Sequence, residues 1–335
     1  SLAKALKEDL GKSGLESWMT EFSVIESSIA QAERELKHWM RPKPLSGGLL
    51  IWPGNARLIP QPKGQVLILS PWNYPVQLLL VPLVAALAAG NTALLKPSEM
   101  VPHVSSELAG LIKDCFAPEE AALFEGGPDT AKALTQLPLN HIFFTGSSRV
   151  GQLVYEAAAK QLIPVTLELG GKNPVWMDET ADVSASVRRL FWSKALNAGQ
   201  TCLAPNLLMA PFALKENIME AWNACCKERF GGSLDLAEDL GSIVNSAHFD
   251  RLQAFLTQGK PLTKLEVESK TRRILPVLLE VEMEPSEEVF GPILPVQWYV
   301  PDESESRWKA MEGQTRKEGP FAAYLFSKSK AKKRA

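Results

Sequence analysis

Three side chains in this sequence have the type and setting that covalent catalysis needs. Cys202 follows a short glycine-containing turn, and a thiolate held there could act as a nucleophile. Glu168 lies near the end of an apolar run, one residue before two glycines, where a carboxylate could act as a general base. Asn73 lies between two prolines and could donate its amide to a developing oxyanion. Taken singly, each has an ordinary explanation: a buried structural cysteine, a solvated strand-end carboxylate and a polar turn.

Three further segments are candidates for nucleotide binding. Residues 143–151 run from an apolar stretch into a glycine-flanked helix start, where N–H groups and the helix dipole favour a phosphate. The spacing is Gly-x-x-x-x-Gly rather than the dinucleotide fingerprint Gly-x-Gly-x-x-Gly, so a serine-rich helix cap explains it equally well. Lys96 and Glu99 could hold two ribose hydroxyls or form only a surface ion pair. Residues 287–292 by themselves indicate a loop.

The elements that must position these side chains alternate between strands and helices. Strands are predicted at 65–69, 92–96, 121–125, 141–145 and 164–169, with helices at 78–89, 105–115, 130–136 and 150–160 between them. Repeated strand–helix–strand units predict an α/β fold with a mostly parallel sheet. Ligands bind such sheets beyond the carboxyl ends of the strands. After residue 171 the pattern restarts with a strand at 174–177 and a helix near 183–197, which predicts a second domain.

The first 60 residues predict a helix and a hairpin. Apolar residues recur at helical spacing from Phe22 to Leu36, and the prolines at 42 and 44 should end that helix. Residues 49–52 and 56–60 are short extended runs on either side of a Pro-Gly-Asn turn, which indicates a β-hairpin.

Composition limits the class of protein. The 335 residues include 36 Lys and Arg against 38 Asp and Glu, a formal charge of −2 that excludes nucleic-acid binding by bulk positive charge. The most apolar run, at 78–89, is shorter than the roughly 20 residues that a membrane span needs. Four cysteines do not form a disulfide framework at this length, and with four histidines no metal site stands out. We therefore expect a reducing, cytoplasmic location and no metal.

The motifs taken together resemble the aldehyde dehydrogenase superfamily, most closely its class 3 and fatty-aldehyde branch. The resemblance covers about residues 60–300. It rests on the order and separation of six segments: 71–75, 96–99, 145–151, 168–172, 199–202 and 288–291.

The resemblance implies a role for each matching position. Cys202 matches the nucleophile that attacks the aldehyde, and Asn73 matches the side chain that holds the oxyanion together with the Cys202 backbone N–H. Glu168 matches the base that activates water to hydrolyse the thioester. NAD is the implied cofactor, with NADP possible. The positions implied to bind it are Trp72, Lys96, Glu99, Gly146, Ser147, Ser148, Arg149, Val150, Gly151, Leu169, Glu288 and Phe290.

The resemblance also implies an architecture. Residues 1–45 and 64–170 are expected to form a Rossmann-type NAD(P)-binding domain, 46–63 a bridging hairpin, and 171–335 a second α/β catalytic domain. The implied substrate is an apolar aliphatic or aromatic aldehyde, and the implied assembly is a homodimer. Since family chains extend further, we expect this chain to be truncated at both ends, without the C-terminal part of its catalytic domain.

Two alternatives to this function stay open. A relative that passes the thioester to coenzyme A would lack a water-activating base, so Glu168 argues against it. A truncated, catalytically silent dinucleotide-binding or interaction protein is the second alternative, and the complete set of reactive side chains argues against that.

Overall fold

The computed structural model describes residues 1–329 and divides into two compact units. The first unit comprises Ser1–Leu2 and Ser17–Glu168, and the second comprises Ala3–Glu16 and the chain from Leu169 onward. The last six residues of the expected catalytic domain, 330–335, lie outside the described residues.

The first unit is built on a five-stranded sheet with the order β5-β4-β3-β6-β7. Its strands are β3 (Gln65–Leu69), β4 (Thr92–Lys96), β5 (Ala121–Leu123), β6 (His141–Gly146) and β7 (Val165–Leu169). β3 pairs in parallel with β4 on one side and β6 on the other, so the strand order reverses at β3. The carboxyl ends of β3 and β6 therefore border the switch point at which open α/β sheets bind ligands.

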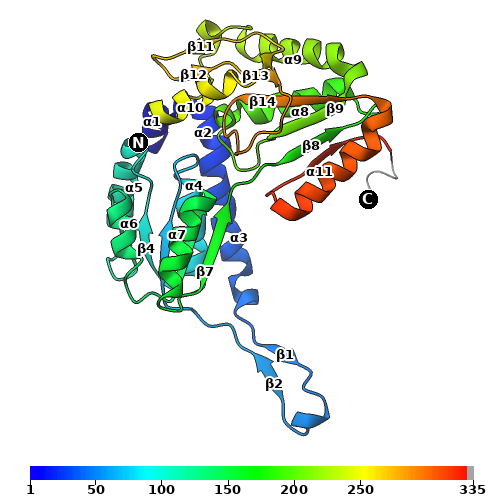
Figure 1. The fold of residues 1–335 in the computed structure, drawn as a ribbon. Coiled ribbons are helices and arrows are strands. Elements are labelled where there is room, and N and C mark those ends of the chain that lie inside the picture. Colours follow the sequence, from blue (N-terminus) through cyan, green and yellow to red (C-terminus); the bar gives the residue numbers. More distant parts are fainter. Residues whose placement is uncertain (330–335) are drawn as a thin grey trace. The chain divides into compact units, whose positions relative to one another are not determined.

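Helices connect the strands of this sheet (Figure 1). They are α4 (Gln77–Ala88), α5 (Pro102–Cys115), α6 (Pro128–Leu134) and α7 (Ser148–Ala159). Because β3 is covered on both faces, its central residues Leu67 and Ile68 are completely buried. The predicted α/β class with a parallel sheet is confirmed.

The N-terminal region has more breaks than the predicted helix. It forms α1 (Leu2–Leu10), α2 (Gly14–Ser17), the π-helical turn η1 (Trp18–Phe22) and α3 (Ser23–Trp39). Gly11 ends α1 in the left-handed conformation at φ +67°. α3 stops before the two prolines as expected, but it has no fully buried residue.

The hairpin exists, but its first strand was predicted wrongly. β1 (Lys43–Leu45) pairs antiparallel with β2 (Ala56–Leu58), whereas the expected strand at 49–52 begins as a 3-10 turn, η2 (Leu49–Ile51). The hairpin extends below α3 in Figure 1. Its tip exposes large apolar side chains, with Leu50 99% and Trp52 78% exposed. The apolar run at 49–52 therefore lies at the tip of the hairpin, beyond the paired segments, and not in a strand.

The second unit contains a six-stranded sheet with the order β10-β13-β14-β9-β8-β15. Its strands are β8 (Pro174–Met177), β9 (Leu207–Pro211), β10 (Lys260–Pro261), β13 (Val277–Glu280), β14 (Ile293–Tyr299) and β15 (Tyr324–Phe326). Neighbouring strands are parallel except at the edge, where β10 runs antiparallel to β13. A separate two-stranded ribbon joins β11 (Val267–Glu268) to β12 (Arg273–Ile274).

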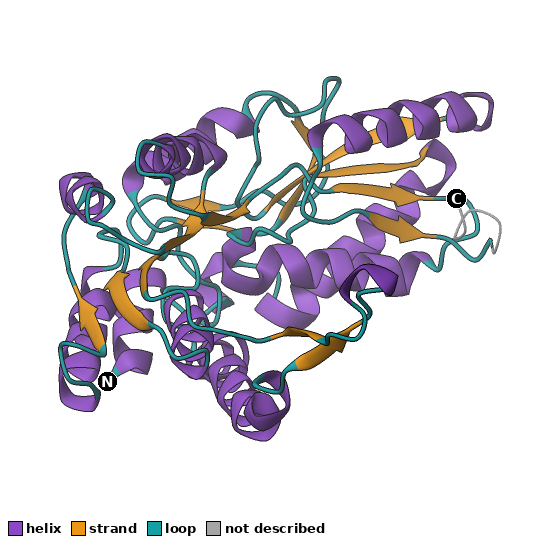
Figure 2. Ribbon diagram, turned by 90° about the horizontal axis from the view of Figure 1, so that it is seen from below, coloured by secondary structure: helices purple, strands orange, loops and turns teal. Residues whose placement is uncertain are grey.

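Alternation along these strands divides the core into two layers. Val175, Leu208 and Val296 stand in register on one face and pack against α8 (Val183–Ala195) and α9 (Lys215–Phe230). The intervening residues on the other face pack against α10 (Ser246–Leu256) and α11 (Ser304–Glu318). Figure 2 shows helices on both sides of these strands. This period of two is what a strand covered on both faces requires.

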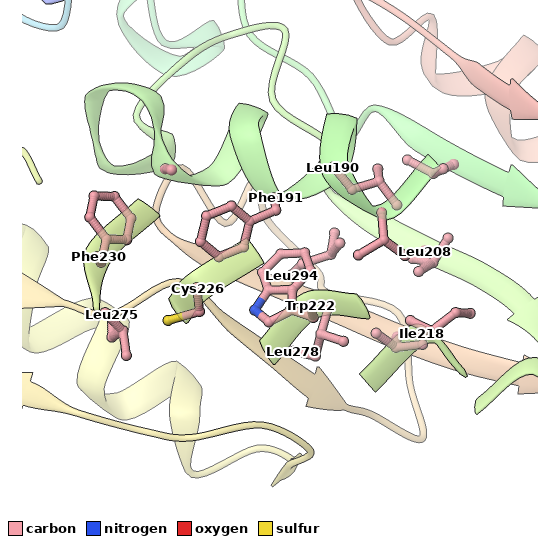
Figure 3. Packing of buried hydrophobic residues seen from close by; sticks show 14 of the residues in the cluster. Leu190, Phe191, Leu208, Ile218, Trp222, Cys226, Phe230, Leu275, Leu278 and Leu294 are labelled. Atoms are coloured by element: carbon pink, nitrogen blue, oxygen red, sulfur yellow. The ribbon is translucent and has the colours of Figure 1, made fainter. Parts of the chain in front are cut away.

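Aromatic side chains fill both layers. In the first, Trp222 lies edge-on to Phe191 (Figure 3), at 5.1 Å between ring centroids. The Trp222 indole N–H donates to the Pro276 carbonyl at 3.0 Å. In the second, Trp176 stacks on Tyr299 at 4.5 Å. These buried rings fix the sheet between its helices.

The segment Ala3–Glu16, which the sequence reading grouped with the cofactor domain, packs within the second unit. Leu6 and Leu10 of α1 are completely buried, and the Ser242 N–H donates to the Leu10 carbonyl at 2.8 Å. A Cβ at Gly11 would lie 2.8 Å from the Ser242 hydroxyl, so only glycine fits that contact. Within residues 1–329, none of the helices has the length and apolar character of a membrane span.

Candidate active site

The loop that carries Trp72 and Asn73 leads from the carboxyl end of β3 into α4. Asn73 is buried at 4% exposure. The buried carboxylate of Glu21 accepts the first N–H groups of the helix, from Val76 at 3.2 Å and Gln77 at 2.8 Å. A carboxylate at a helix N-terminus is favoured by both hydrogen bonding and the helix dipole. The end of the Asn73 loop is therefore firmly anchored.

The predicted phosphate segment lies where β6 gives way to α7. Ser147 is the N-cap of α7, and its hydroxyl accepts the Val150 N–H at 3.4 Å. Residues 147–150 are exposed, and the first-turn N–H groups of a helix have no partner within the helix. Gly146 and Gly151 flank this exposed turn, which can therefore receive an anion.

Lys96 and Glu99 form a pair at the carboxyl end of β4. The Lys96 ammonium donates to a Glu99 carboxylate oxygen at 3.0 Å and to the Pro97 carbonyl at 2.8 Å. The lysine side chain is buried, whereas that of Glu99 is 42% exposed. The ion pair predicted as the plain alternative is present, and it leaves the glutamate accessible to a ligand.

Cys202, in the second unit, follows a turn with an unusual backbone. Asn197, Ala198 and Gly199 have φ angles of +49°, +49° and +68° in succession, within η3 (Leu196–Gly199). A left-handed conformation costs a residue with a side chain about 1–3 kcal/mol and persists only where the surroundings impose it. Glycine is required at 199, because a Cβ there would overlap the Gly291 carbonyl.

Buried side chains impose this backbone. Glu16 accepts the Asn197 N–H at 2.8 Å. The amide of Gln200 donates to the Asn197 and Ser242 carbonyls, each at 3.0 Å, and accepts the Val244 N–H at 3.1 Å. Glu16 and Gln200 are both buried, so these bonds are shielded from water.

The chain beyond Cys202 is held as well. The buried Asn173 amide donates to the Cys202 carbonyl at 2.6 Å and the Ala204 carbonyl at 3.0 Å. The Tyr324 hydroxyl donates to the Leu203 carbonyl at 2.6 Å. The cysteine thus lies on a loop fixed on both sides, which suits a nucleophile that must meet its target in one orientation.

The predicted cofactor residues Glu288 and Phe290 lie on the loop that touches this turn. A Cβ at Gly170 would overlap the Glu288 carboxylate, so the glycine makes room for it. Arg251 donates to the Glu288 carbonyl at 3.4 Å and the Val289 carbonyl at 2.8 Å. Leu169, also predicted to contact the cofactor, is the last residue of β7 and directly precedes Gly170.

Glu288 carries a strongly shifted pKa. Burial raises its pKa to about 7, against the opposing effects of the Gly171 N–H, Lys194 and Arg251. Its buried Oε1 has no hydrogen-bond partner within the part of the chain that the structure describes. A buried acceptor in this state is able to take a hydroxyl donor from a ligand.

Lys194 was missed by the sequence reading. Its side chain is 1% exposed and donates to the Gly291 carbonyl at 3.2 Å. Burial lowers its pKa to about 7, although Glu288 opposes the change. The available signal was its position on α8, since Val187, Leu190, Phe191 and Lys194 follow the i, i+3, i+4, i+7 spacing of a buried stripe.

The structure brings together the Cys202 turn, the Glu288 loop and Gly170 within the second unit. Asn73, Glu168 and the segment 146–151 belong to the first unit. Among the described residues, no group of three or more His, Cys, Asp or Glu side chains is arranged to hold a metal ion.

The sequence model of the aldehyde dehydrogenase family matches residues 1–315. The chain belongs to this family. The dehydrogenase is 38% identical to 4,4'-diaponeurosporen-aldehyde dehydrogenase of Staphylococcus aureus, over 97% of this chain and 71% of that protein. It is 40% identical to human aldehyde dehydrogenase family 3 member B1, over 98% of this chain and 70% of the relative. It therefore spans about 70% of the length of these relatives.

Solved structures agree with the family assignment. The substrate-bound state of Staphylococcus aureus AldH matches with a TM-score of 0.93 at 36% identity, covering 99% of this chain and 73% of that one. A Mycobacterium tuberculosis aldehyde dehydrogenase complexed with NAD+ shares the fold, with a TM-score of 0.81 at 23% identity, over 98% of this chain and 74% of that one. The predicted family and its fold are confirmed, and this dehydrogenase is an NAD(P)-dependent oxidoreductase. A catalytically silent module is not favoured.

Proposed function

We propose that this chain oxidises an apolar aldehyde to the carboxylic acid with NAD(P)+, through a thioester on Cys202. The observation that carries the proposal is the meeting of two loops in the second unit. Gly291, at the end of the Glu288 loop, lies against Gly199, three residues before Cys202. This contact supports the proposal because it joins the loop of the proposed nucleophile to the loop of a proposed cofactor contact.

The first step is assigned to the thiolate of Cys202. Its sulfur attacks the aldehyde carbon, and the carbonyl oxygen becomes an oxyanion that the Asn73 amide and the Cys202 backbone N–H are proposed to hold. When bound, a nicotinamide dinucleotide would accept the hydride that leaves the former aldehyde carbon, so that the oxyanion collapses to the carbonyl of a thioester on Cys202. Loss of one oxyanion donor typically slows such reactions by about 10²–10³-fold.

The second step is assigned to Glu168. Its carboxylate takes a proton from water, and the resulting hydroxide attacks the thioester carbonyl. The carbon–sulfur bond then breaks, which releases the acid and restores the Cys202 thiolate. Since that thiol must stay reduced to act, we place the protein in a reducing, cytosol-like compartment.

The residues present fit a dinucleotide. The exposed first turn of α7 suits the pyrophosphate, and the free Oε1 of Glu288 suits a ribose hydroxyl. Glu99 would accept hydroxyls of the other ribose and repel a 2′-phosphate. Because its neighbour Lys96 is already bonded to Glu99 and Pro97, we propose a preference for NAD over NADP.

The proposed substrate class and assembly rest on exposed apolar side chains. Leu203, directly after the nucleophile, is 45% exposed, which favours an apolar aldehyde. The β1–β2 hairpin exposes Leu49, Leu50 and Trp52. Burial of such a patch favours association, so we propose a homodimer bridged by the hairpin.

The test is the variant Cys202→Ala, with Cys115→Ala as its matched control on the exposed end of α5. Medium-chain and aromatic aldehydes are offered with NAD, and NADH formation is followed by absorbance. We expect Cys202→Ala to abolish turnover and to keep its NAD affinity in a fluorescence titration, while Cys115→Ala turns over normally. Unchanged turnover in Cys202→Ala would refute the mechanism.

A further inference from the structure

The strained turn before Cys202 depends on a contact from a distant part of the chain. Glu16, on the short helix α2, lies 181 residues away in sequence from Asn197, whose N–H it accepts at 2.8 Å. Glu16 is itself held, since its own N–H donates to the Ser13 hydroxyl at 3.2 Å. Both residues belong to the second unit.

The contact is made at the residue where the strained, left-handed backbone begins. Asn197 and Ala198 both have φ +49°, a conformation that a residue with a side chain leaves unless something prevents it. The Asn197 N–H leads into this strained pair, and the residue is completely buried. A buried N–H that loses its acceptor costs about 1–3 kcal/mol, which favours relaxation of the turn that leads to Cys202.

The other contacts that support the turn are made by other atoms. Gln200 bonds the Asn197 carbonyl, and the Asn197 side chain donates to the Gln200 carbonyl at 3.2 Å. Gly199 rests against Gly291. The Asn197 N–H itself is bonded to Glu16.

We propose that Glu16 is a positioning residue for the nucleophile, which acts by accepting the Asn197 N–H and so holding the left-handed turn that presents Cys202. The role depends on the reach of an oxygen acceptor at the end of the Glu16 side chain. Glu16 is not one of the groups that react with the aldehyde or with water. For its kinetic consequence, this role rests on the proposed function.

Two conservative variants separate the effect of the length of the Glu16 side chain from the effect of its charge. Glu16→Gln keeps an acceptor oxygen at the same reach and removes the charge, whereas Glu16→Asp keeps the charge and is one methylene too short. Glu266→Asp is the matched control, because the Glu266 carboxylate accepts the Leu234 N–H in the same unit.

The first measurement is hydrogen exchange of the peptide spanning residues 196–202, without aldehyde or cofactor. We expect about tenfold faster exchange in Glu16→Asp, and exchange within about threefold of the unmodified chain in Glu16→Gln and Glu266→Asp. This result stands whether or not the chain oxidises aldehydes, so it can fail separately from the proposed function. Unchanged exchange in Glu16→Asp, or equal acceleration in Glu16→Gln, overturns the proposal.

The second measurement is steady-state aldehyde oxidation. We expect kcat to fall about tenfold in Glu16→Asp at unchanged NAD affinity, and to stay within about threefold of the unmodified value in Glu16→Gln. Adding Ala198→Gly to Glu16→Asp should restore at least half of the lost kcat, because glycine adopts φ +49° without strain. A general loss of folding would not be rescued in this way, so absence of rescue overturns the proposed role.

Discussion

Replacing Lys194 by methionine should change the pH dependence of stability in a defined direction. Lys194 is completely enclosed, and burial lowers its pKa from 10.5 to about 7. At pH values between these two numbers the unfolded chain binds a proton at this lysine that the folded chain does not. The penalty for burying Lys194 is therefore fully present below pH 7 and is lost as the pH rises toward 10.5.

The size of the effect follows from the same two pKa values. At 1.36 kcal/mol per pH unit, burial of Lys194 costs about 4 kcal/mol at pH 7, and more than half of this disappears between pH 8 and pH 10. Methionine removes the penalty but leaves the Gly291 carbonyl without its donor, a loss of about 1–3 kcal/mol. The variant should therefore be more stable at pH 7 and lose that advantage by pH 10.

Urea unfolding from pH 6 to pH 10, followed by tryptophan fluorescence, measures this difference. The control is Leu190→Met on the same buried stripe of α8, whose effect on the free energy of unfolding should not vary with pH. A constant difference between the Lys194→Met variant and the unmodified chain from pH 8 to pH 10 would refute the reasoning. It would mean that Lys194 stays protonated in the folded state.

Three further substitutions test other parts of the site. Glu168→Gln should slow thioester hydrolysis more than hydride transfer, so that a pre-steady-state NADH burst precedes a slow steady state; loss of the burst at normal steady-state rate would contradict this. Glu288→Gln should abolish the rise in NAD affinity expected as the carboxylate ionises through pH 7. If fluorescence titrations from pH 6 to 8 still show that rise in the variant, another group causes it. Gly199→Ala, at φ +68° and against the Gly291 carbonyl, should lower the free energy of unfolding in urea by about 1–3 kcal/mol, whereas a change below about 0.5 kcal/mol would show that the turn yields.

The fold was predictable where burial on both faces leaves a clear pattern. The predicted strands 65–69, 92–96 and 174–177 match β3, β4 and β8 residue for residue. Each is covered by helices, so its apolar run coincides with its length. The run at 49–52 misled the reading because its side chains are exposed and its backbone is not paired as a strand.

Residues of the candidate site could be predicted from the sequence only where a reactive residue type stands in a recognisable short motif. Cys202 and Glu288 are predicted site residues because each stands in a short motif, and the structure brings the Cys202 turn and the Glu288 loop into contact. Glu16 and Lys194 are not predicted, because each acts on a segment 97 or more residues away. The apolar stripe of α8 indicates that Lys194 is buried but does not identify its partner, and a lone glutamate on a short helix is usually solvated.

The way the N-terminal segment packs sets an order for folding during synthesis. The first unit is complete in sequence at residue 168, while the segment Ala3–Glu16 has its partners at Asn197 and Ser242. At a synthesis rate of about 5–20 residues per second, roughly 10–45 s pass between the synthesis of Leu10 and that of Ser242. During that time Leu6 and Leu10 have no native site to enter. We therefore expect α1 to be accessible to chaperones on the ribosome, and the turn before Cys202 to take its final form only after Ser242 has been made.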